Sequence, residues 1–532
     1  MPVREVDYCA PSLTIFPMKK LRTVIIAILA ILLLSWPALI NGQAFVFSDS
    51  TNYLRAGGAA WKEVFKTGLG SDWAEPVKGA PAAASSVATS GTEESPAPVL
   101  GNESLPLNDP EAGLVMAGRS PYLGIAAFLS SAFGEFWPWV FGLGLINYYL
   151  ITLTLRVVGV EDSRPRLLSA AVIGLVTPAA FYNSTMLADA FCAQGVVGLA
   201  LWLLASSRLR TIDKVILAAL TVFSAMAHLT HILVYFGMLF AFLVFRLCTR
   251  GPWRPAIPGI LMGLASIVIG LVSVKITSVM IEKTYGNPPV QLPMLTARFC
   301  DDGPGARYLK EHPEDTSFLV SRFRDRLPMS SQLFLWNPTP GESVYLSLNQ
   351  EERLRMCSED KAFAIKVFCT YPIQQSLAIL SNAFKQAGNL DMHIFNYSDA
   401  HIEHFRKRLP TEDFQRLETT RAYRSGWAME RFTLLHYVTA ILSLATLCFC
   451  WFRQDDKISL DDRQLLRGLF LLFVAAILAN GLICGAASEP QGRYGARLAW
   501  IITLAPLVWL ARSRFPIQSR SATKEQEPML SS

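Results

Sequence analysis

The sequence predicts an all-α, polytopic membrane protein with about ten transmembrane helices and a large extracytoplasmic loop region of mixed or helical structure. Of its 532 residues, 52% are hydrophobic and only 17% are charged, whereas soluble domains carry about a quarter charged residues. Apolar runs of membrane-spanning length recur along the chain, and Lys and Arg cluster beside them. The net charge of +6 therefore follows the pattern of membrane proteins and does not indicate a nucleic-acid partner.

The first apolar run covers 23–40 and follows a basic N-terminal segment, 1–19, which we expect in the cytoplasm. The sequence "ALINGQA" lacks a good small-residue cleavage site, so we interpret the run as an uncleaved span and not as a signal peptide. Further spans are predicted at 136–156, 167–183, 187–206, 215–229, 231–248, 256–280, 432–452, 466–485 and 497–511. These spans form an N-terminal module at 20–280 and a C-terminal group at 432–512, followed by a cytoplasmic tail at 513–532.

The charges test this topology. With the N-terminus inside, every predicted inside segment is basic, from Arg156, Arg164 and Arg166 after the second span to Arg512 and Arg514 after the last. We expect an integral, multi-pass protein of a bacterial inner (plasma) membrane, with the active site on the periplasmic face.

Two long regions then fall outside the cytoplasm, at 43–135 and 281–431. The first contains an Ala/Pro/Ser/Gly-rich insert at about 74–112, which we expect to be disordered. After it, "RSPYLGIAAFLSSAFG", which begins at Arg119, predicts an amphipathic helix on the membrane surface. The second region is long enough for a small domain of its own.

Polar residues gather at the predicted outer face. Charged groups near the apolar core are expensive to bury, so those that occur there tend to have a function. The candidates are Asp49 after the first span, Asp189 between the third and fourth, His228 and His231 between the fifth and sixth, and Glu489, Gln491, Arg493, Tyr494 and Arg497 between the ninth and tenth.

This distribution suits glycosyl transfer from a lipid-linked sugar. The tail of a polyprenyl phosphate sugar would stay in the bilayer while its phosphate sits at the interface. A carboxylate such as Asp49 can take the proton of an acceptor hydroxyl as it attacks the anomeric carbon. Arg493 and Arg497 can neutralise the departing phosphate by charge-assisted hydrogen bonds.

The same residues resemble motifs of the GT-C superfamily of membrane glycosyltransferases, which includes protein O-mannosyltransferases and lipid A aminoarabinose transferases. Asp49 and Tyr53 match a D-x-x-x-Y pattern after the first span, and Asp189 matches a second acidic residue at the next outer turn. "GRSPYLG" around Arg119 and "GRYGARL" around Arg493 resemble further GT-C segments. The resemblance covers most of 20–280 and 432–512.

The resemblance implies catalytic roles for Asp49 and Asp189, phosphate binding by Arg493, Tyr494 and Arg497, and inversion by direct displacement. Arg119, His228, His231, Glu489 and Gln491 are predicted substrate contacts. No cofactor is required by the sequence, although a divalent metal is compatible with the superfamily. The subfamily is not assigned, because protein O-mannosyltransferases place Glu directly after the Asp, where this chain has Ser50.

Each candidate also has a plainer interpretation. Asp49 could be a solvated helix end, and Asp189 could cap the fourth span. His228 and His231 are more often structural than ligands, and Arg493 and Arg497 could anchor headgroups by snorkelling. Cys300, Cys357 and Cys369 share one polar stretch, where two of them could form a disulfide, with the pairing left open.

The expected partners are a lipid-linked sugar donor, the lipid bilayer and an extracytoplasmic glycolipid, polysaccharide or protein acceptor, with no nucleic acid. Three alternatives remain open. A polysaccharide polymerase or ligase would place its important arginines in the second outer region, where Arg298, Arg322, Arg324 and Arg326 stand. A transporter or flippase would show broken spans and internal repeats. The third alternative is an inert envelope scaffold.

Overall fold

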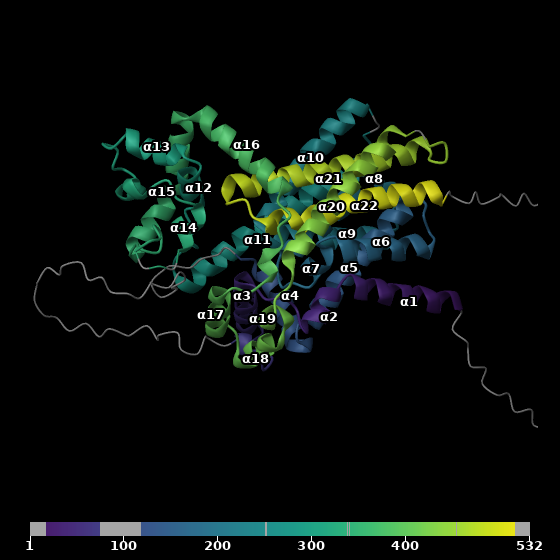
Figure 1. The fold of residues 1–532 in the computed structure, drawn as a ribbon, viewed down its shortest axis with the longest axis horizontal. Coiled ribbons are helices and arrows are strands. Elements are labelled where there is room, and N and C mark those ends of the chain that lie inside the picture. The colour runs from purple at the N-terminus through teal and green to yellow at the C-terminus, as the bar shows by residue number, and fades with distance from the viewer. Residues whose placement is uncertain are drawn as a thin grey trace, which may run out of the picture.

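The computed structural model describes residues 18–74, 119–250, 253–337, 339, 341–453 and 455–515, and this part is almost entirely helical (Figure 1). The described residues contain no β-strand, only an isolated parallel bridge between Phe45 and Thr185. The predicted disordered insert lies outside the described residues from 75 on. So do most of the two predicted cytoplasmic tails.

Twelve of the described helices build an elongated bundle (Figure 1). They are α1 (Met18–Leu33), α2 (Trp36–Asn41), α5 (Trp137–Val157), α6 (Ser163–Val176), α7 (Ala179–Asn183), α8 (Asp189–Ala205), α9 (Thr211–Ala227), α10 (Leu229–Thr249), α11 (Ile257–Tyr285), α20 (Met429–Phe452), α21 (Leu460–Ala487) and α22 (Gly492–Arg514). A short 3-10 helix, η2 (Ser206–Arg208), follows α8.

Within the described residues, seven helices are long and apolar enough to cross a membrane: α5, α8, α10, α11, α20, α21 and α22. An eighth span results if the bent pair α15 and α16, described below, is counted as one. The chain is thus an all-α protein with the helices of a multi-pass membrane protein. Three further predicted spans coincide with α1, α6 and α9, which have 16, 14 and 17 residues, so the count of ten stays a prediction.

Two runs that were predicted as continuous spans are broken at prolines. The run 23–40 divides into α1, which ends at Leu33, and α2, which has Pro37 in its first turn. The run 167–183 divides where α6 ends at Val176, two residues before Pro178. Proline lacks a backbone N–H and restricts the residue before it, so a helix starts at or stops before it more readily than it continues through it.

The remaining described helices lie at one end of the bundle (Figure 1). They are α3 (Ser48–Phe65), η1 (Asp72–Ala74), α4 (Pro121–Gly134), α12 (Met294–Asp301), α13 (Pro304–Glu311), η3 (Leu319–Arg326), α14 (Ser331–Trp336), α15 (Gln350–Thr370), α16 (Pro372–Gly388), η4 (His393–Phe395), α17 (Asp399–Arg408), α18 (Thr411–Thr419) and α19 (Arg421–Arg424).

The second outer region has two parts with different cores. Phe334, Tyr345 and Phe363 are fully buried in a small core shared by α12 to α15, separate from the core of the bundle. Phe405 on α17 and Leu417 on α18 instead belong to the bundle core. Only the first part therefore has the separate core expected of a small domain.

α3 and α4 cross so closely that glycine is needed on both helices. A Cβ on Gly57 would lie 2.1 Å from the carbonyl carbon and oxygen of Gly124. The predicted amphipathic helix is α4, and it packs against α3 through this contact. Of its large apolar side chains, Phe133 is the exposed one, at 73%.

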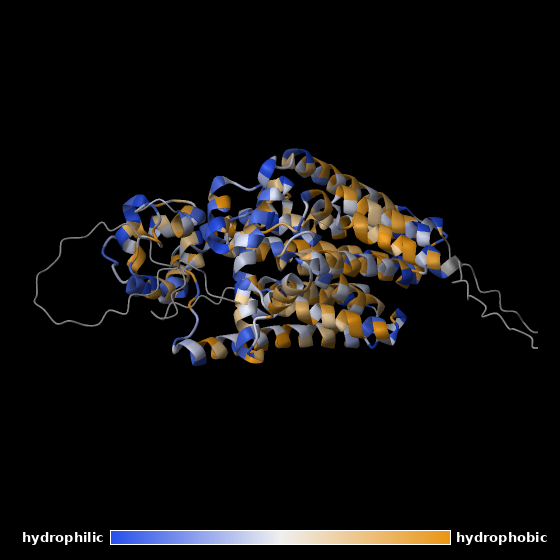
Figure 2. Cartoon of the chain, turned by 90° about the horizontal axis from the view of Figure 1, so that it is seen from below, coloured by the Kyte–Doolittle hydropathy of each residue, from blue (hydrophilic) through white to orange (hydrophobic). Residues whose placement is uncertain are grey.

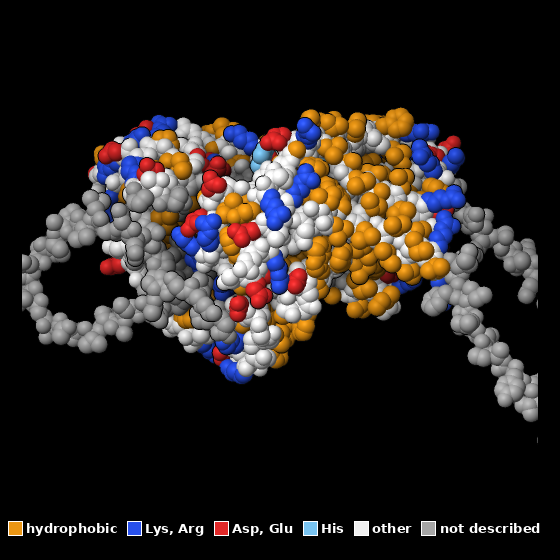
Figure 3. Space-filling view, turned by 60° about the horizontal axis from the view of Figure 1, so that its bottom comes forward, with side chains coloured by type: hydrophobic (Ala, Val, Ile, Leu, Met, Phe, Trp, Pro, Cys, Tyr) orange, Lys and Arg blue, Asp and Glu red, His pale blue; other side chains and the backbone are white. Residues whose placement is uncertain are grey.

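The surface of the bundle is apolar along its middle. Figure 2 shows hydrophobic residues along the bundle helices and hydrophilic residues at their ends, and Figure 3 shows the same apolar band in space-filling form, with Lys and Arg grouped beyond it. Phe240 is 71% exposed, Leu261 is 60% exposed and Ile441 is 63% exposed. Such a belt is the surface that hydrocarbon chains cover in a membrane.

At the end of the bundle where α22 finishes, the basic residues are held by buried acids. Asp462 accepts from Arg208 Nη1 at 2.5 Å and from Arg512 Nη2 at 3.0 Å, and Asp213 pairs with Arg156. These are residues that the topology prediction places on the cytoplasmic side. They tie the ends of α5, η2, α9, α21 and α22 together.

Candidate functional site

Five charged side chains form one continuous series of ion pairs at the end of the bundle where α22 begins. Asp49 pairs with Arg119 and accepts from Arg493 Nη1 at 2.9 Å. Arg493 Nε donates to Asp189 Oδ2 at 2.9 Å, and Arg497 Nη1 donates to Asp189 Oδ1 at 2.9 Å. The order Arg119, Asp49, Arg493, Asp189, Arg497 alternates in sign from end to end.

Helix starts place these groups together. Asp49 lies in the first turn of α3, and Asp189 is the first residue of α8. Carboxylates are favoured there because the unpaired N–H groups of a helix start carry partial positive charge. Arg493 and Arg497 are four residues apart near the start of α22 and share a face, so each can contact Asp189.

Asp49 is the more accessible of the two acids, with a side chain that is 18% exposed. Burial alone would raise its pKa, but the guanidinium groups of Arg493 and Arg119 outweigh burial and hold the pKa at about 2. Asp49 is therefore ionised at neutral pH. A carboxylate with so low a pKa is a weak base while both guanidinium groups contact it.

Asp189 and Arg497 lie deeper, each with a side chain that is 1% exposed. Arg497 Nη2 also donates to Asn480 Oδ1 at 2.5 Å and to Thr230 Oγ1 at 3.3 Å. Its Nε is buried without a hydrogen-bond partner among the described residues. The site thus has a fixed inner pair and a more exposed outer pair, joined by Arg493.

The series carries a net positive charge, because three guanidinium groups face two carboxylates. Arg119 also lies over the ring of Tyr53 at 5.9 Å, and Tyr494 lies within 5.4 Å of Arg493 and 5.2 Å of Arg497. Aromatic rings at such distances attract guanidinium groups by cation–π interactions, which do not neutralise the positive charge. The arrangement therefore favours an anion, and phosphate fits the forked donors of arginine.

The two histidines adjoin the site without joining its ion pairs. Thr230 N donates to His228 Nδ1 at 3.2 Å, so His228 caps the start of α10. His231 Nδ1 lies 2.8 Å from the carbonyl oxygen of Ser224, and its ring lies 5.5 Å from that of His228. Their described contacts are structural, which favours the plainer interpretation of both residues.

Glu489 and Gln491 lie away from the series. Burial and the nearby Asp301 raise the pKa of Glu489, against the effect of Arg298, so Glu489 faces the outer region. Gln491 contributes its backbone groups: its N–H donates to Gln386 Oε1 at 2.8 Å, and its carbonyl oxygen accepts from Gln386 Nε2 at 2.8 Å. The structure does not bring either predicted side chain to Asp49 or Asp189.

Three contributors to the site were missed by sequence reasoning. Asn480 lies inside an apolar run, and a polar side chain at such a place is a signal that could have been used. Thr230 sits between the two histidines that drew attention. Ser50, noted for standing where a Glu was expected, donates to the carbonyl oxygen of Met186 at 3.0 Å and so holds α3 against the segment before Asp189.

The possible disulfide is not formed: among the described cysteines, Cys300, Cys357 and Cys369 are all free thiols. Cys357 and Cys369 lie twelve positions apart on the single helix α15, about 18 Å at 1.5 Å per residue, which is too far for a bond. Cys300 is fully buried on α12. Within the described ranges, no group of three or more His, Cys, Asp or Glu is arranged to hold a metal ion.

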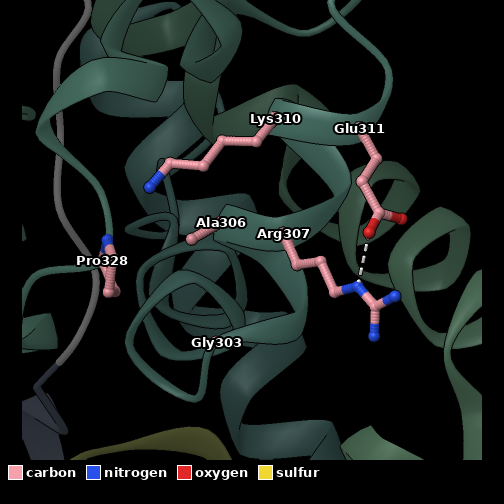
Figure 4. A pocket seen from close by; sticks show the side chains of 6 residues that line it. All are labelled: Gly303, Ala306, Arg307, Lys310, Glu311 and Pro328. Atoms are coloured by element: carbon pink, nitrogen blue, oxygen red, sulfur yellow. Dashed lines mark hydrogen bonds and ion pairs between the residues drawn. The ribbon is translucent and has the colours of Figure 1, made fainter.

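The outer region has a hollow of its own. It has a volume of about 350 Å³ and lies beside α13, where Arg307 Nε donates to Glu311 at 2.7 Å and Lys310 extends across it (Figure 4). Pro328 closes one side. It contains none of the predicted site residues.

Comparison of the chain with protein-family models, with curated proteins and with solved structures finds no match.

Proposed function

We propose that the chain is a membrane glycosyltransferase of the GT-C kind, which transfers a sugar from a polyprenyl phosphate-linked donor to an extracytoplasmic acceptor. The observation that supports this most is the ion-pair series of Arg119, Asp49, Arg493, Asp189 and Arg497 at the end of an apolar bundle. It combines a carboxylate with surplus guanidinium charge, which are the two requirements of the chemistry. The proposal includes ten spans and a periplasmic site in a bacterial inner membrane.

In the resting protein, Asp49 is neutralised by two arginines. A donor phosphate would compete for Arg493 and Arg119 and release the carboxylate, which raises its pKa toward that of a useful base. Binding of the donor thus frees the Asp49 carboxylate to take the proton of the acceptor hydroxyl.

The proposed step is a single displacement. The acceptor oxygen forms a bond to the anomeric carbon while its proton passes to Asp49. The bond between that carbon and the phosphate oxygen breaks, and the electron pair leaves with polyprenyl phosphate. Arg493 and Arg497 stabilise the charge gained by the phosphate, and Asp189 fixes both arginines in place. Asp189 is thus a positioning residue and not a second acid.

Asp49→Asn tests the base. In a strain that lacks the chromosomal gene, mass spectrometry of envelope glycans should show the product restored by the wild type and by Asp72→Asn, an exposed control in the same outer region, but not by Asp49→Asn. A positioned base contributes about 10²–10⁴-fold to rate. Full restoration by Asp49→Asn, with protein levels equal, would remove the proposed base.

Binding of undecaprenyl phosphate tests the anion site without knowledge of the sugar, because the lipid phosphate is the product of every such donor. Arg493→Gln should weaken binding to the purified protein by about tenfold or more, while Arg431→Gln, an exposed arginine on α20, should leave it unchanged. Equal binding by both variants would exclude Arg493 as the phosphate ligand.

The arginines that a polymerase or ligase would use have partners within the second outer region. Arg298 pairs with Asp301 and Asp302, and Arg322 pairs with Glu352. Arg324 and Arg326 donate to backbone oxygens of neighbouring segments. These contacts suit residues that hold the outer domain together.

A further inference from the structure

α16 has a stripe of large apolar side chains that no described part of the chain covers. Ile373, Leu377, Leu380 and Phe384 are 75%, 61%, 50% and 69% exposed. They are spaced by four, three and four residues, which places them on one helix face. We call these four residues the α16 stripe.

The opposite face of α16 is packed against a membrane-spanning helix. A Cβ on Gly485 of α21 would lie 2.6 Å from the carbonyl oxygen of Asn382, so the two backbones nearly touch. Gln386 on the same face is fully buried and holds the backbone of Gln491. α16 is therefore fixed to the bundle at the end where the ion-pair series lies.

The span that α16 contacts also exposes apolar side chains. Leu478 and Leu482 on α21 are 49% and 44% exposed, and each lies three residues before a glycine that meets α16, Gly481 or Gly485. α16 has one charged residue, Lys385, in its 17 residues. α15, which meets α16 at a bend of 112°, has a far more charged sequence, QEERLRMCSEDKAFAIKVFCT. The bend thus separates a helix with many charged residues from one with a single charged residue.

We propose that α16 lies in the membrane leaflet at the end of the bundle that holds the ion-pair series, with the α16 stripe inserted among lipid acyl chains. An apolar helix face with polar residues beside it binds at the boundary between headgroups and acyl chains, and it leaves no large apolar patch in water. The partner is lipid and not protein, because α16 is packed against α21, a helix long and apolar enough to cross a membrane, and so lies where acyl chains are at hand. This inference does not rest on the glycosyltransferase proposal.

Photo-crosslinking of the full chain in lipid nanodiscs tests the proposal. p-Benzoylphenylalanine is placed singly at Leu377 or Phe384, at Leu478 as the lipid-facing reference, and at Lys361 of α15 as the exposed reference in water. After illumination, the intact mass reports whether a phospholipid or a second chain has been captured. Ile373 replaces either stripe position if that variant does not purify as a single species.

We expect lipid adducts at Leu377 and Phe384 in yields close to that of Leu478 and about tenfold or more above that of Lys361. Yields as low as that of Lys361 would show that the stripe faces water and overturn the proposal. Adducts with a second copy of the chain, or with another protein when the experiment is repeated in native membranes, would also overturn it, because a protein would then cover the stripe.

Discussion

Arg493 joins Asp49 and Asp189 by donating from Nη1 to the first and from Nε to the second, across 444 and 304 positions of sequence. One side chain therefore connects the starts of α3, α8 and α22. Lysine cannot replace it, because an ammonium group is a point charge and does not present two donors in a fixed plane.

The pH dependence of the proposed reaction follows from the state of Asp49 in the free protein. Its pKa is lowered to about 2, so the carboxylate is ionised above about pH 4 and loses its charge only in stronger acid. The acid limb of kcat/KM, which reports the free enzyme, should therefore show no titration of Asp49 between pH 5 and 8. An apparent pKa in that interval that disappears in Asp49→Asn would contradict this expectation.

Asp189→Asn should destabilise the protein strongly, because it removes the charge that compensates buried Arg497. Loss of one partner of a buried pair costs about 3–5 kcal/mol. Thermal unfolding in detergent should show a lower midpoint for Asp189→Asn and for Arg497→Gln. The loss of stability in the double variant should be smaller than the sum of the losses in the two single variants, because neither Asp189 nor Arg497 is then left as an unpaired charge. Strict additivity would show that the two residues do not interact.

Gln386→Leu should loosen the junction between α16 and α22. The change deletes two hydrogen bonds to the backbone of Gln491. The N–H of Gln491 then loses its side-chain acceptor, while its C=O keeps the bond that it accepts from Tyr494 N at 3.1 Å. A hydrogen bond of this kind contributes about 0.5–1.5 kcal/mol. The unfolding midpoint should fall, and Ser381→Ala, an exposed change on the same helix, serves as the control. A midpoint equal to that of the control would mean that the junction tolerates the loss.

Gly57→Ala should prevent α3 and α4 from crossing as they do. The added methyl group would lie 2.1 Å from the backbone of Gly124, far inside contact distance. Because Asp49 is on α3 and Arg119 lies two residues before the start of α4, the variant should lose glycan product as well as stability. Gly142→Ala on α5, where a Cβ would meet nothing within 4 Å, should be neutral in both measurements.

The cysteines can be tested by alkylation. Cys369 is exposed, whereas Cys300 is fully buried. Maleimide should label Cys369 in the folded protein within minutes and label Cys300 only after unfolding, and reduction beforehand should change neither result. Labelling of Cys369 only after reduction would restore the disulfide that the sequence first suggested.

Much of this architecture is predictable from hydropathy, for a physical reason. A span must be apolar over its length, so α5 at Trp137–Val157 and α20 at Met429–Phe452 lie within a few residues of the predicted 136–156 and 432–452. Hydropathy does not register where a run breaks, and so the turns before α2 and α7 were missed although Pro37 and Pro178 mark them.

The sequence was enough to select the charged residues of the candidate site, but not to predict which of them form ion pairs with each other. Asp49, Asp189 and Arg493 were selected because a topology rule places them on one face, and the structure joins them. Which arginine contacts which acid depends on helix orientation, which no local pattern encodes. The contact of α16 with the bundle was missed for a different reason. Its polar and apolar residues are interleaved as in a helix of a soluble protein, and only the structure shows that it packs against α21.

α22 is held at both of its ends. Arg493 and Arg497 engage acids at its start, and Arg512 engages Asp462 near its finish, 19 residues from Arg493 and so about 28 Å along the axis. A helix anchored at both ends resists movement relative to its neighbours. Rocking the two halves of the molecule past each other would therefore break buried ion pairs at one end of α22 or the other. Alternating-access transport depends on such rocking, and the ion pairs at the two ends of α22 would oppose it.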